Sequence, residues 1–492
     1  MRCFNLRKCA AIILAITVLA LSIPIFADTW SAGVSLLSVR HNFGAETIGK
    51  KIYVMGGDAN GFMTRTVQVF DSETGNWEVK SDMPRSKDGF GTAILNQKIY
   101  LVGGYTSSYG QNLFEEYDPT TDTWTLKKNL PTERTALGVA TVNGKIYAIG
   151  GHLQGGASIA FRTVEEYDPA TDSWTKKSDM PTGRRSFAVG VVNGKIYAIG
   201  GYVYGTTPNI INTVEEYDPS TDTWTTKSPM PTARCDLQVE VIDGKIYAIG
   251  GQYATIDKNV VECYDPATDK WITCEPMPIT QSKYFRTTTL DGKIFVMGGY
   301  KGIFTSSDLV QIFVPTPSQP LNLIAAPGNT QISLSWDGIQ SATGYNVKRS
   351  LTPGGPYETI RTTVDTSFID TTVTNGTTYY YIVTAVNSGG ESKNSNEASA
   401  TPYTDGIPTN LFGTWDGGII LSWDSVVGAT GYNVKRSLTS GGPYTIIASN
   451  VSTSFYFDKD AIPGTNYYYV VSAVNANGES ANSNELLVTP DM

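Results

Sequence analysis

Two short apolar runs, an alternating segment and a segment with one tryptophan recur along the first two thirds of the chain. The clearest copy begins at Arg134 and reads RTALGVATVNGKIYAIGG, then a variable stretch, then TVEEYDPATDSW. ALGVATV and KIYAIGG are nearly continuous apolar runs, as expected for strands covered on both faces, and Asn143-Gly144 between them favours a tight hairpin. TVEEY alternates, and WTKKS pairs one large ring with solvated charges. The pattern predicts a four-stranded antiparallel sheet whose burial falls from the first strand to the fourth.

This unit occurs six times. Gly-Gly pairs and tryptophans both recur at intervals of 47 to 50 residues, so two independent markers share one period. Such a period is typical of a β-propeller in which each repeat is one blade. The last repeat has a third strand but no tryptophan after it, so we expect the N-terminal strand at Trp30 to complete blade six and close the ring. The pairs begin at Gly56, Gly103, Gly150, Gly200, Gly250 and Gly298, and the tryptophans are Trp30, Trp77, Trp124, Trp174, Trp224 and Trp271.

The Gly-Gly after an apolar strand, the Tyr-Asp-Pro turn and the tryptophan about 20 residues later resemble kelch repeats. The resemblance covers residues 28–314 and implies a six-bladed propeller. The WD-repeat alternative lacks its Trp-Asp and Gly-His signatures.

A second pair of repeats follows a proline-bearing linker at residues 315–320. GYNVKRSLT and a following GGPY appear in both copies, and Trp336 and Tyr379 of the first correspond to Trp423 and Tyr467 of the second. Each copy has about seven short strand candidates, and the pattern resembles fibronectin type III sandwiches with the two tyrosines at the tyrosine corner. We expect these domains at residues 318–403 and 405–490. The predicted fold is all-β, a six-bladed kelch propeller followed by two fibronectin type III β-sandwiches.

Residues 1–27 are typical of a secretory signal peptide, with a positive start at Arg2, Arg7 and Lys8 and an apolar run before Ala27. An uncleaved anchor helix is the alternative, which Pro24 disfavours. No later stretch is long enough to span a membrane. The net charge of -9 argues against a nucleic-acid partner. We therefore expect a secreted or cell-surface protein, monomeric, without a membrane span once the signal is removed.

The loops between the second and third strands of each blade are long and variable, and they lie on the face opposite the Asn-Gly turns. Aromatic and cationic side chains on this face suit either a glycan, whose rings stack on aromatic side chains, or a protein partner. The longest loops, in blades three and four, are expected to carry recognition. The candidate ligand-binding residues are Tyr105, Arg134, His152, Phe161, Arg162, Arg184, Tyr202, Tyr204, Arg234, Tyr253 and Tyr300, and the same loops also carry Tyr109 and Phe304.

Arg134, Arg184 and Arg234 belong to a ring of residues that lie ten positions after each tryptophan. The other members are Arg40, Lys87 and Gln281. A cradle for carboxylates is one interpretation, since Arg binds them in bidentate fashion. A residue present in every blade more often serves what every blade needs, so inter-blade hydrogen bonding is the favoured interpretation.

Other chemistry is sparse, and we expect no cofactor, no metal and no catalytic residue. The acidic turn from Asp118 to Asp122 lacks the glycine-containing calcium pattern, and an Asp that caps its own turn explains it. Copper radical oxidases similar to galactose oxidase have kelch-type propellers and need two histidines, two tyrosines and a tyrosine-linked cysteine. This chain has only His41 and His152, with Cys235 in the register of His41.

Cys263 and Cys274 replace, in blade five, a glutamate and a lysine that occupy the same places in blades two to four. In an exported protein they are expected to form a disulfide, with Cys235 free. Altogether the sequence predicts a non-catalytic binding or adhesion protein for an extracellular glycan or protein, with the tail as a spacer. The alternative is a carbohydrate-active enzyme, either galactose-oxidase-like or sugar-epimerase-like.

Overall fold

The computed structural model describes residues 28–106, 112–153, 159–205, 209–254, 256–281, 283–300, 305–402, 406–475 and 478–490. Every regular element in these ranges is a β-strand, which confirms the predicted all-β class. The described residues include no helix that is long and apolar enough to cross a membrane. The proposed signal peptide, Tyr109 and Phe304 lie outside the described residues.

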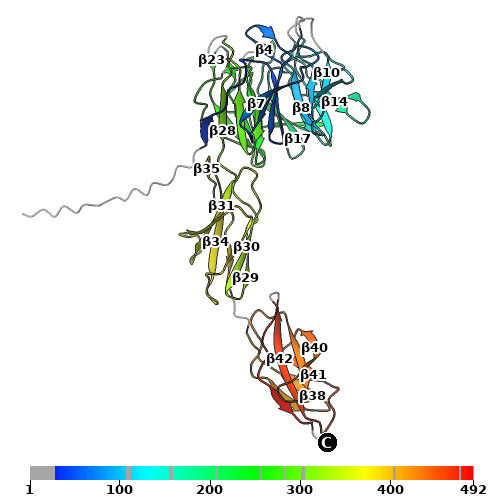
Figure 1. The fold of residues 1–492 in the computed structure, drawn as a ribbon, viewed down its shortest axis with the longest axis vertical. Helices are drawn as coiled ribbons and strands as arrows, with labels where there is room; N and C mark the ends of the chain where they lie inside the picture. The colour runs from blue at the N-terminus through cyan, green and yellow to red at the C-terminus, as the bar shows by residue number, and fades with distance from the viewer. Residues whose placement is uncertain are drawn as a thin grey trace, which may run out of the picture.

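The N-terminal part consists of six four-stranded antiparallel sheets, which are the blades (Figure 1). In each blade the second strand is almost completely buried and the fourth is largely exposed, as the alternation of apolar and polar residues predicts. The strands, from the inside outwards, are β2 (Gly44–Ile48), β3 (Lys51–Met55), β6 (Val67–Asp71) and β7 (Asn76–Lys80) in blade one; β8 (Gly91–Leu95), β9 (Lys98–Val102), β10 (Phe114–Asp118) and β11 (Thr123–Leu126) in blade two; β12 (Gly138–Val142), β13 (Lys145–Ile149), β14 (Val164–Asp168) and β15 (Ser173–Lys177) in blade three; β16 (Ala188–Val192), β17 (Lys195–Ile199), β18 (Val214–Asp218) and β19 (Thr223–Lys227) in blade four; β20 (Gln238–Ile242), β21 (Lys245–Ile249), β24 (Val261–Asp265) and β25 (Lys270–Thr273) in blade five; and β26 (Arg286–Leu290), β27 (Lys293–Met297), β28 (Val310–Val314) and β1 (Thr29–Ala32) in blade six.

The blades form a closed ring. The innermost strands β2, β8, β12, β16, β20 and β26 each contact the innermost strands of both neighbouring blades, and β26 returns to β2. Strand β1 pairs antiparallel with β28, with Trp30 opposite Phe313, so the N-terminal strand completes blade six. Both ends of the propeller chain thus meet in one sheet, which leaves no blade incomplete.

The tryptophans and the Tyr-Asp turns tie each blade to the one before it. The indole N–H of Trp174 donates to the carbonyl of Lys128, and that of Trp30 donates to Glu275 at 3.0 Å. Asp172 accepts a hydrogen bond from the hydroxyl of Tyr167 in its own blade and from the backbone N–H of Lys128 in the previous blade. The acidic turn that resembled a metal loop therefore joins neighbouring blades through hydrogen bonds.

Two β-sandwiches follow, each built from a three-stranded and a five-stranded sheet. The tyrosine corners are present, because the hydroxyl of Tyr379 accepts from the N–H of Thr374 and that of Tyr467 accepts from the N–H of Ile462. The first sandwich contains β29 (Ile324–Gly328), β30 (Gln331–Ser335) and β33 (Ser367–Asp370), packed on β31 (Gly344–Ser350), β32 (Glu358–Thr363), β34 (Tyr379–Asn387), β35 (Gly390–Glu391) and β36 (Ala398–Ala400). The second contains β37 (Phe412–Trp415), β38 (Ile419–Ser422) and β41 (Phe455–Asp458), packed on β39 (Gly431–Ser437), β40 (Thr445–Val451), β42 (Tyr467–Asn475), β43 (Gly478–Glu479) and β44 (Leu486–Val488).

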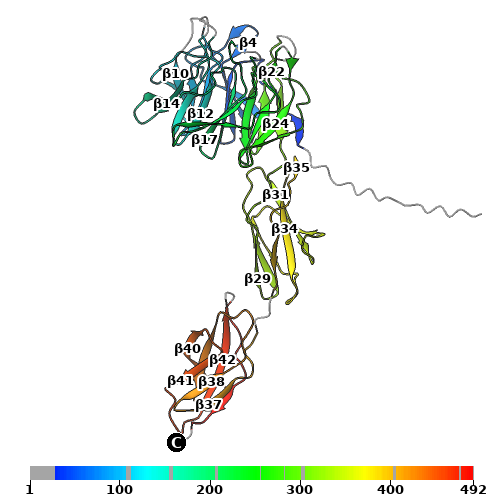
Figure 2. The ribbon, with the colours of Figure 1, turned by 180° about the vertical axis from the view of Figure 1, so that it is seen from behind.

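The first sandwich docks on the propeller beneath blade five. Asp243, in the hairpin turn between β20 and β21, accepts hydrogen bonds from the backbone N–H groups of Ser318 and Ser341. Asn387 donates to the carbonyl of Pro315 at the start of the linker. The short hairpins β4 (Asp58–Ala59) with β5 (Phe62–Met63) and β22 (Gln252–Tyr253) with β23 (Ile256–Asp257) lie at the other end of the propeller (Figure 2). The variable face is thus turned away from the tail.

Candidate functional site

The ring residues do not reach the variable face. Arg134, Arg184 and Arg234 are completely buried, which corrects their prediction as ligand contacts. Arg184 donates to the carbonyls of Gly200 and Thr213 and forms an ion pair with Glu215. Lys87 and Glu115 form the equivalent pair in blade two at 2.6 Å. These cations bind carbonyl groups where strands end, which is the structural role that the sixfold register favoured.

The chain turns into the innermost strands through a belt of residues with left-handed backbone conformations. Asn42, Gly89, Ala136, Ser186, Asp236 and Tyr284 have φ between 50° and 59°. In five of the six, the backbone N–H donates to a backbone carbonyl in the neighbouring blade: Asn42 donates to Tyr284, Gly89 to Asn42, Ala136 to Gly89, Ser186 to Ala136, and Asp236 to Ser186. The bond that would join Tyr284 to Asp236 is absent from these described residues, so the belt is open between blades five and six.

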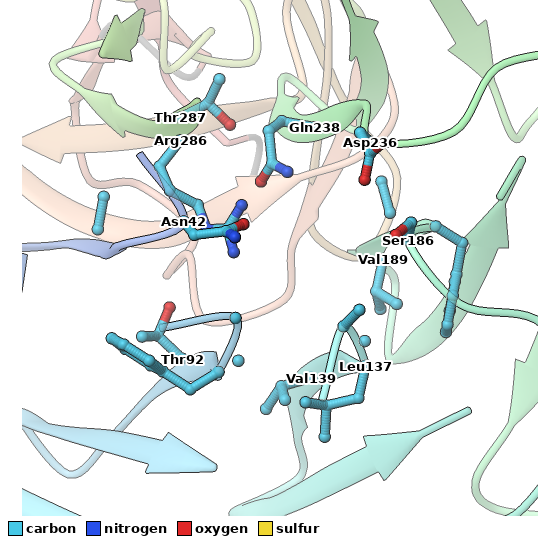
Figure 3. Close-up of a pocket in the computed structure, with 18 of the residues that line it drawn as sticks. Asn42, Thr92, Leu137, Val139, Ser186, Val189, Asp236, Gln238, Arg286 and Thr287 are labelled. Carbon is cyan, nitrogen blue, oxygen red and sulfur yellow. The ribbon is translucent and has the colours of Figure 1, made fainter. Parts of the chain in front are cut away.

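A cavity of about 640 Å³ lies inside this belt and forms the central channel. Its lining is asymmetric: Asn42, Gln238 and Arg286 lie on one side and Leu137, Val139 and Val189 on the other (Figure 3). Around these labelled residues, the channel is therefore polar on the side of blades five, six and one and apolar along the innermost strands of blades three and four. The first position of the innermost strand shows the cause, since it is glycine or alanine in blades one to four but Gln238 and Arg286 in blades five and six.

Burial in the channel wall changes the protonation of its acids. Desolvation raises the pKa of Glu46 to about 7 and that of Glu240 to about 8. Glu240 accepts a hydrogen bond from the hydroxyl of Thr287 at 2.7 Å. At the mouth, desolvation raises the pKa of Asp88 to about 6 and lowers that of Arg286 to about 10. The channel can therefore offer neutral carboxyl donors as well as charged acceptors near neutral pH.

A second cavity of about 510 Å³ opens from the mouth between blades four and five. Arg185, Ser186, Asp236 and Tyr284 line both cavities, so channel and groove are continuous there. We call this second cavity the groove; its other lining residues are Tyr202, Asn209, Ile210, Cys235, Gln252, Tyr253 and Ala254.

Planar polar groups and aromatic rings contact one another in the groove. The guanidinium of Arg185 lies 4.8 Å from the centroid of the Tyr202 ring, and Asn209 donates to the Tyr202 hydroxyl at 3.0 Å. Gln252 donates to Asp236 at 2.7 Å. These contacts fix the orientation of the polar groups before any ligand arrives, which lowers the entropic cost of binding.

Of the loop residues predicted to bind a ligand, Tyr202 and Tyr253 line the groove and His152 lines the channel. His152 lies 3.4 Å from the Arg185 guanidinium, and desolvation followed by that charge lowers its pKa to about 4. Tyr300 instead packs on His41 at the rim between blades six and one, with its hydroxyl 3.1 Å from His41 Nε2.

The remaining predicted residues lie outside both cavities. Tyr204 is 58% exposed and Arg162 donates to the carbonyl of Met180. Phe161 is partly buried beside Gly183, and Tyr105 pairs by backbone with Asp88. None of these four is among the residues that line the channel or the groove.

Sequence reasoning missed Arg185, Asp236, Tyr284 and Arg286. A usable signal existed, because Arg185 directly follows ring residue Arg184 in the same register as His41 and Cys235. Aligning the repeats to one another marks such positions as those where blades differ while their scaffold does not.

The histidines do not form the donor set of a copper radical oxidase. His41 contacts Tyr300, Tyr284 and Ser306, whereas His152 contacts Arg185 in blade four. The described residues contain no group of three or more His, Cys, Asp or Glu side chains placed to hold a metal ion. Because the two histidines have separate contacts, neither group of side chains matches a copper centre that needs two histidines.

Cys263 and Cys274 occupy diagonal rather than directly opposite places on β24 and β25, since Cys263 faces Ile272 and the N–H of Cys274 donates to Val261. The corresponding Glu216 and Lys227 form an ion pair at 3.5 Å. The two cysteines are free thiols in this structure, so the disulfide stays a prediction.

Comparison with known proteins identifies the repeats. The KLHDC2/KLHL20/DRC7 Kelch-repeats domain model matches residues 42–251, and the Kelch motif model matches residues 233–278. The propeller is built of kelch repeats. The solved structure of YjhT shares this fold at 15% identity and a TM-score of 0.50, covering 56% of this chain and 95% of that one.

The remaining matches are of a different kind. A PBP1-like, fibronectin3-like domain model matches residues 326–395, within the first sandwich. The amylopullulanase of Thermoanaerobacter thermohydrosulfuricus is 44% identical over 119 residues, and that of Thermoanaerobacterium saccharolyticum is 43% identical over 107. These matches cover 23% and 21% of this chain but only 8% of each enzyme. The chain thus shares a segment with these enzymes and spans a small fraction of their length.

Proposed function

We propose that this chain is an exported, non-catalytic binding protein whose kelch propeller recognises carbohydrate at the channel mouth and groove. The observation that carries the proposal is the groove itself, which Tyr202, Tyr253 and Tyr284 line together with Arg185 and Asp236. Sugar rings present apolar C–H faces that pack on aromatic side chains and hydroxyls that pair with planar polar groups, so this mixture matches a sugar.

Three further observations support the proposal. The signal-like residues 1–27 favour export. The first sandwich docks on the end of the propeller opposite the groove, so the tail leaves the groove uncovered. The shared segment relates the chain to proteins named amylopullulanases, and on that basis we include α-glucans among the ligands to be tested. The two fibronectin modules act as a spacer in this proposal.

The test is a glycan array that includes α-glucan oligosaccharides, probed with the full mature chain and with single tyrosine variants. Tyr202→Ala should lower binding about tenfold or more, because it removes both a stacking surface and the partner of Arg185. Tyr204→Ala is the matched control, since its ring is exposed and lies outside the groove. No array binding by the unmodified chain, or equal loss in both variants, would remove the groove from the proposal.

An enzyme is the second candidate, and the channel acids favour it. Carboxyl groups with pKa values near neutrality in a cavity are typical of general acid–base sites, although structural acids share this property. Incubating the array ligands with the chain and analysing them by chromatography separates the two functions. Unchanged ligands support binding alone, whereas a product lost in Glu240→Gln or Glu46→Gln would establish the enzyme.

A further inference from the structure

The two fibronectin modules are near copies, so differences between them at matched places show what one does that the other does not. The outer face of the three-stranded sheet differs between them. In the first module, one row across this face is Ile324, Ser335 and Ser367, and the next is Ala326, Ser333 and Ile369. In the second module, the same rows are Phe412, Ser422 and Phe455, then Thr414, Ile420 and Phe457.

The three phenylalanines are exposed, at 59% for Phe412, 50% for Phe455 and 42% for Phe457. None belongs to the core of the module, to which the same sheet contributes the inward residues Ile419 and Leu421. Burying such rings would be favourable by about 25 cal/mol per Å², so their exposure on one face marks a contact surface.

Gly418 allows one of these rings to lie flat against the sheet. A Cβ at Gly418 would come within 2.5 Å of Cζ of Phe457, so any other residue would push the ring away. The first module has Gln331 at this place. The loss of a side chain and the gain of three rings therefore occur together in the second module and produce a flat aromatic surface.

Size and charge decide what the surface can bind. Three strands of four residues give a face of about 10 Å by 13 Å. This is far smaller than the roughly 800 Å² per partner that a stable protein interface needs. The six outward residues include no charged side chain, so nothing on the face selects an ionic partner. A neutral chain of sugar rings, which can stack on the phenylalanine rings, fits both limits.

We infer that the outer face of β37, β38 and β41, centred on Phe412, Phe455 and Phe457, is a second carbohydrate-contact surface that takes neutral polysaccharide. The inference rests on the proposed function, because it assigns the same ligand class to the tail. The spacer would then hold the chain on a polysaccharide surface while the propeller groove binds its own ligand.

The test measures retention of the full chain on granular starch and, separately, on microcrystalline cellulose. The variant combines Phe412→Ile, Phe455→Ser and Phe457→Ile, which installs residues that the first module already carries at these places, so the sandwich should fold. It should lose retention about fivefold or more on at least one polysaccharide. The control combines Ile324→Ala and Ile369→Ala on the matched face of the first module and should leave retention unchanged.

Two results would overturn the inference. One is unchanged retention of the triple variant, or no retention of the unmodified chain on either solid. The other is a lower sedimentation coefficient for the triple variant than for the unmodified chain, which would make the face a contact between copies. The glycan array tests the groove separately, and the triple variant should lose the same fraction of retention on the solids whether or not it also carries Tyr202→Ala, so the two proposals can fail independently.

Discussion

The guanidinium of Arg234 donates to the carboxylate of Glu262 at 2.7 Å, with both side chains withdrawn from solvent. The same guanidinium donates to the carbonyls of Gly250 and Val260, so one cation joins the start of blade five to its second and third strands. Burial lowers the pKa of Arg234, while Glu262 opposes that effect. The pair therefore has a structural role, because it joins the strands of blade five below the variable face.

Arg234→Ala should therefore destabilise the propeller by about 3–5 kcal/mol, because it leaves a carboxylate buried and unpaired. Arg162→Ala, which removes an exposed arginine, should cost less than about 1 kcal/mol. Urea denaturation monitored by tryptophan fluorescence measures both. The double variant Arg234→Met with Glu262→Leu should recover part of the loss, and a neutral Arg234→Ala would contradict the structural role.

The channel acids should make stability fall as the pH rises. The pKa of Glu240 is raised to about 8 in the folded chain against an ordinary value of 4.5, so the folded chain keeps a proton that the unfolded chain releases. This difference is absent below pH 4.5 and grows from there to about pH 8. Glu240→Gln should raise the free energy of unfolding at pH 8 by on the order of 3 kcal/mol and leave it nearly unchanged at pH 4. Glu73→Gln, at an exposed turn, is the control in the same thermal melts.

Ring closure should depend on the first described strand. Trp30→Ala removes the hydrogen bond to Glu275 and the ring contact with Phe313, whose centroid lies 4.9 Å away. Because the indole is only partly buried, the expected loss is roughly 2 kcal/mol, about half that of a core tryptophan. Ser31→Ala in the same strand should have little effect. Calorimetry that gives Trp30→Ala the melting temperature of the unmodified chain would mean that β1 contributes nothing to closure.

The cysteines of blade five should be linked in the exported protein. Peptide mapping of non-reduced protein, alkylated before digestion, should give a peptide pair joined through Cys263 and Cys274, with Cys235 alkylated. We expect this because the two cysteines occupy the positions at which a diagonal Glu–Lys ion pair joins the third and fourth strands of blades two to four. A bond there should stabilise blade five by about 2–3 kcal/mol. Recovery of both as alkylated thiols would show that their diagonal placement keeps them apart.

The first sandwich should be released by a single substitution. Asp243→Ala removes the acceptor for Ser318 and Ser341, so the tail should move more freely and the radius of gyration from small-angle X-ray scattering should rise or its distribution broaden. Asn193→Ala is matched in position, since Asn193 is in the same turn of blade four and shares the positive φ. An identical scattering profile for the two variants would mean that the docking rests on other contacts.

The amino-acid pattern by itself determined the blades, the sandwiches and the place of each strand. Period-two alternation, Asn-Gly turns and a fixed tryptophan spacing are local signals, and local signals decide local structure. The sixfold register also favoured a structural role for the arginine ring, because a residue that recurs in every blade, like Arg234 and its counterparts, serves the hydrogen bonding that every blade requires. The strand at Trp30 followed from counting, since only one tryptophan lacked a blade.

Only the tertiary structure decided the site. Arg185, Asp236, Tyr284 and Arg286 come from three blades, and no short-range pattern says that they line one continuous cavity. The open belt between Asp236 and Tyr284 also depends on how six repeats close, which is a property of the ring rather than of any repeat. Long-range closure sets these distances, whereas sequence spacing sets only the order of residues along each strand.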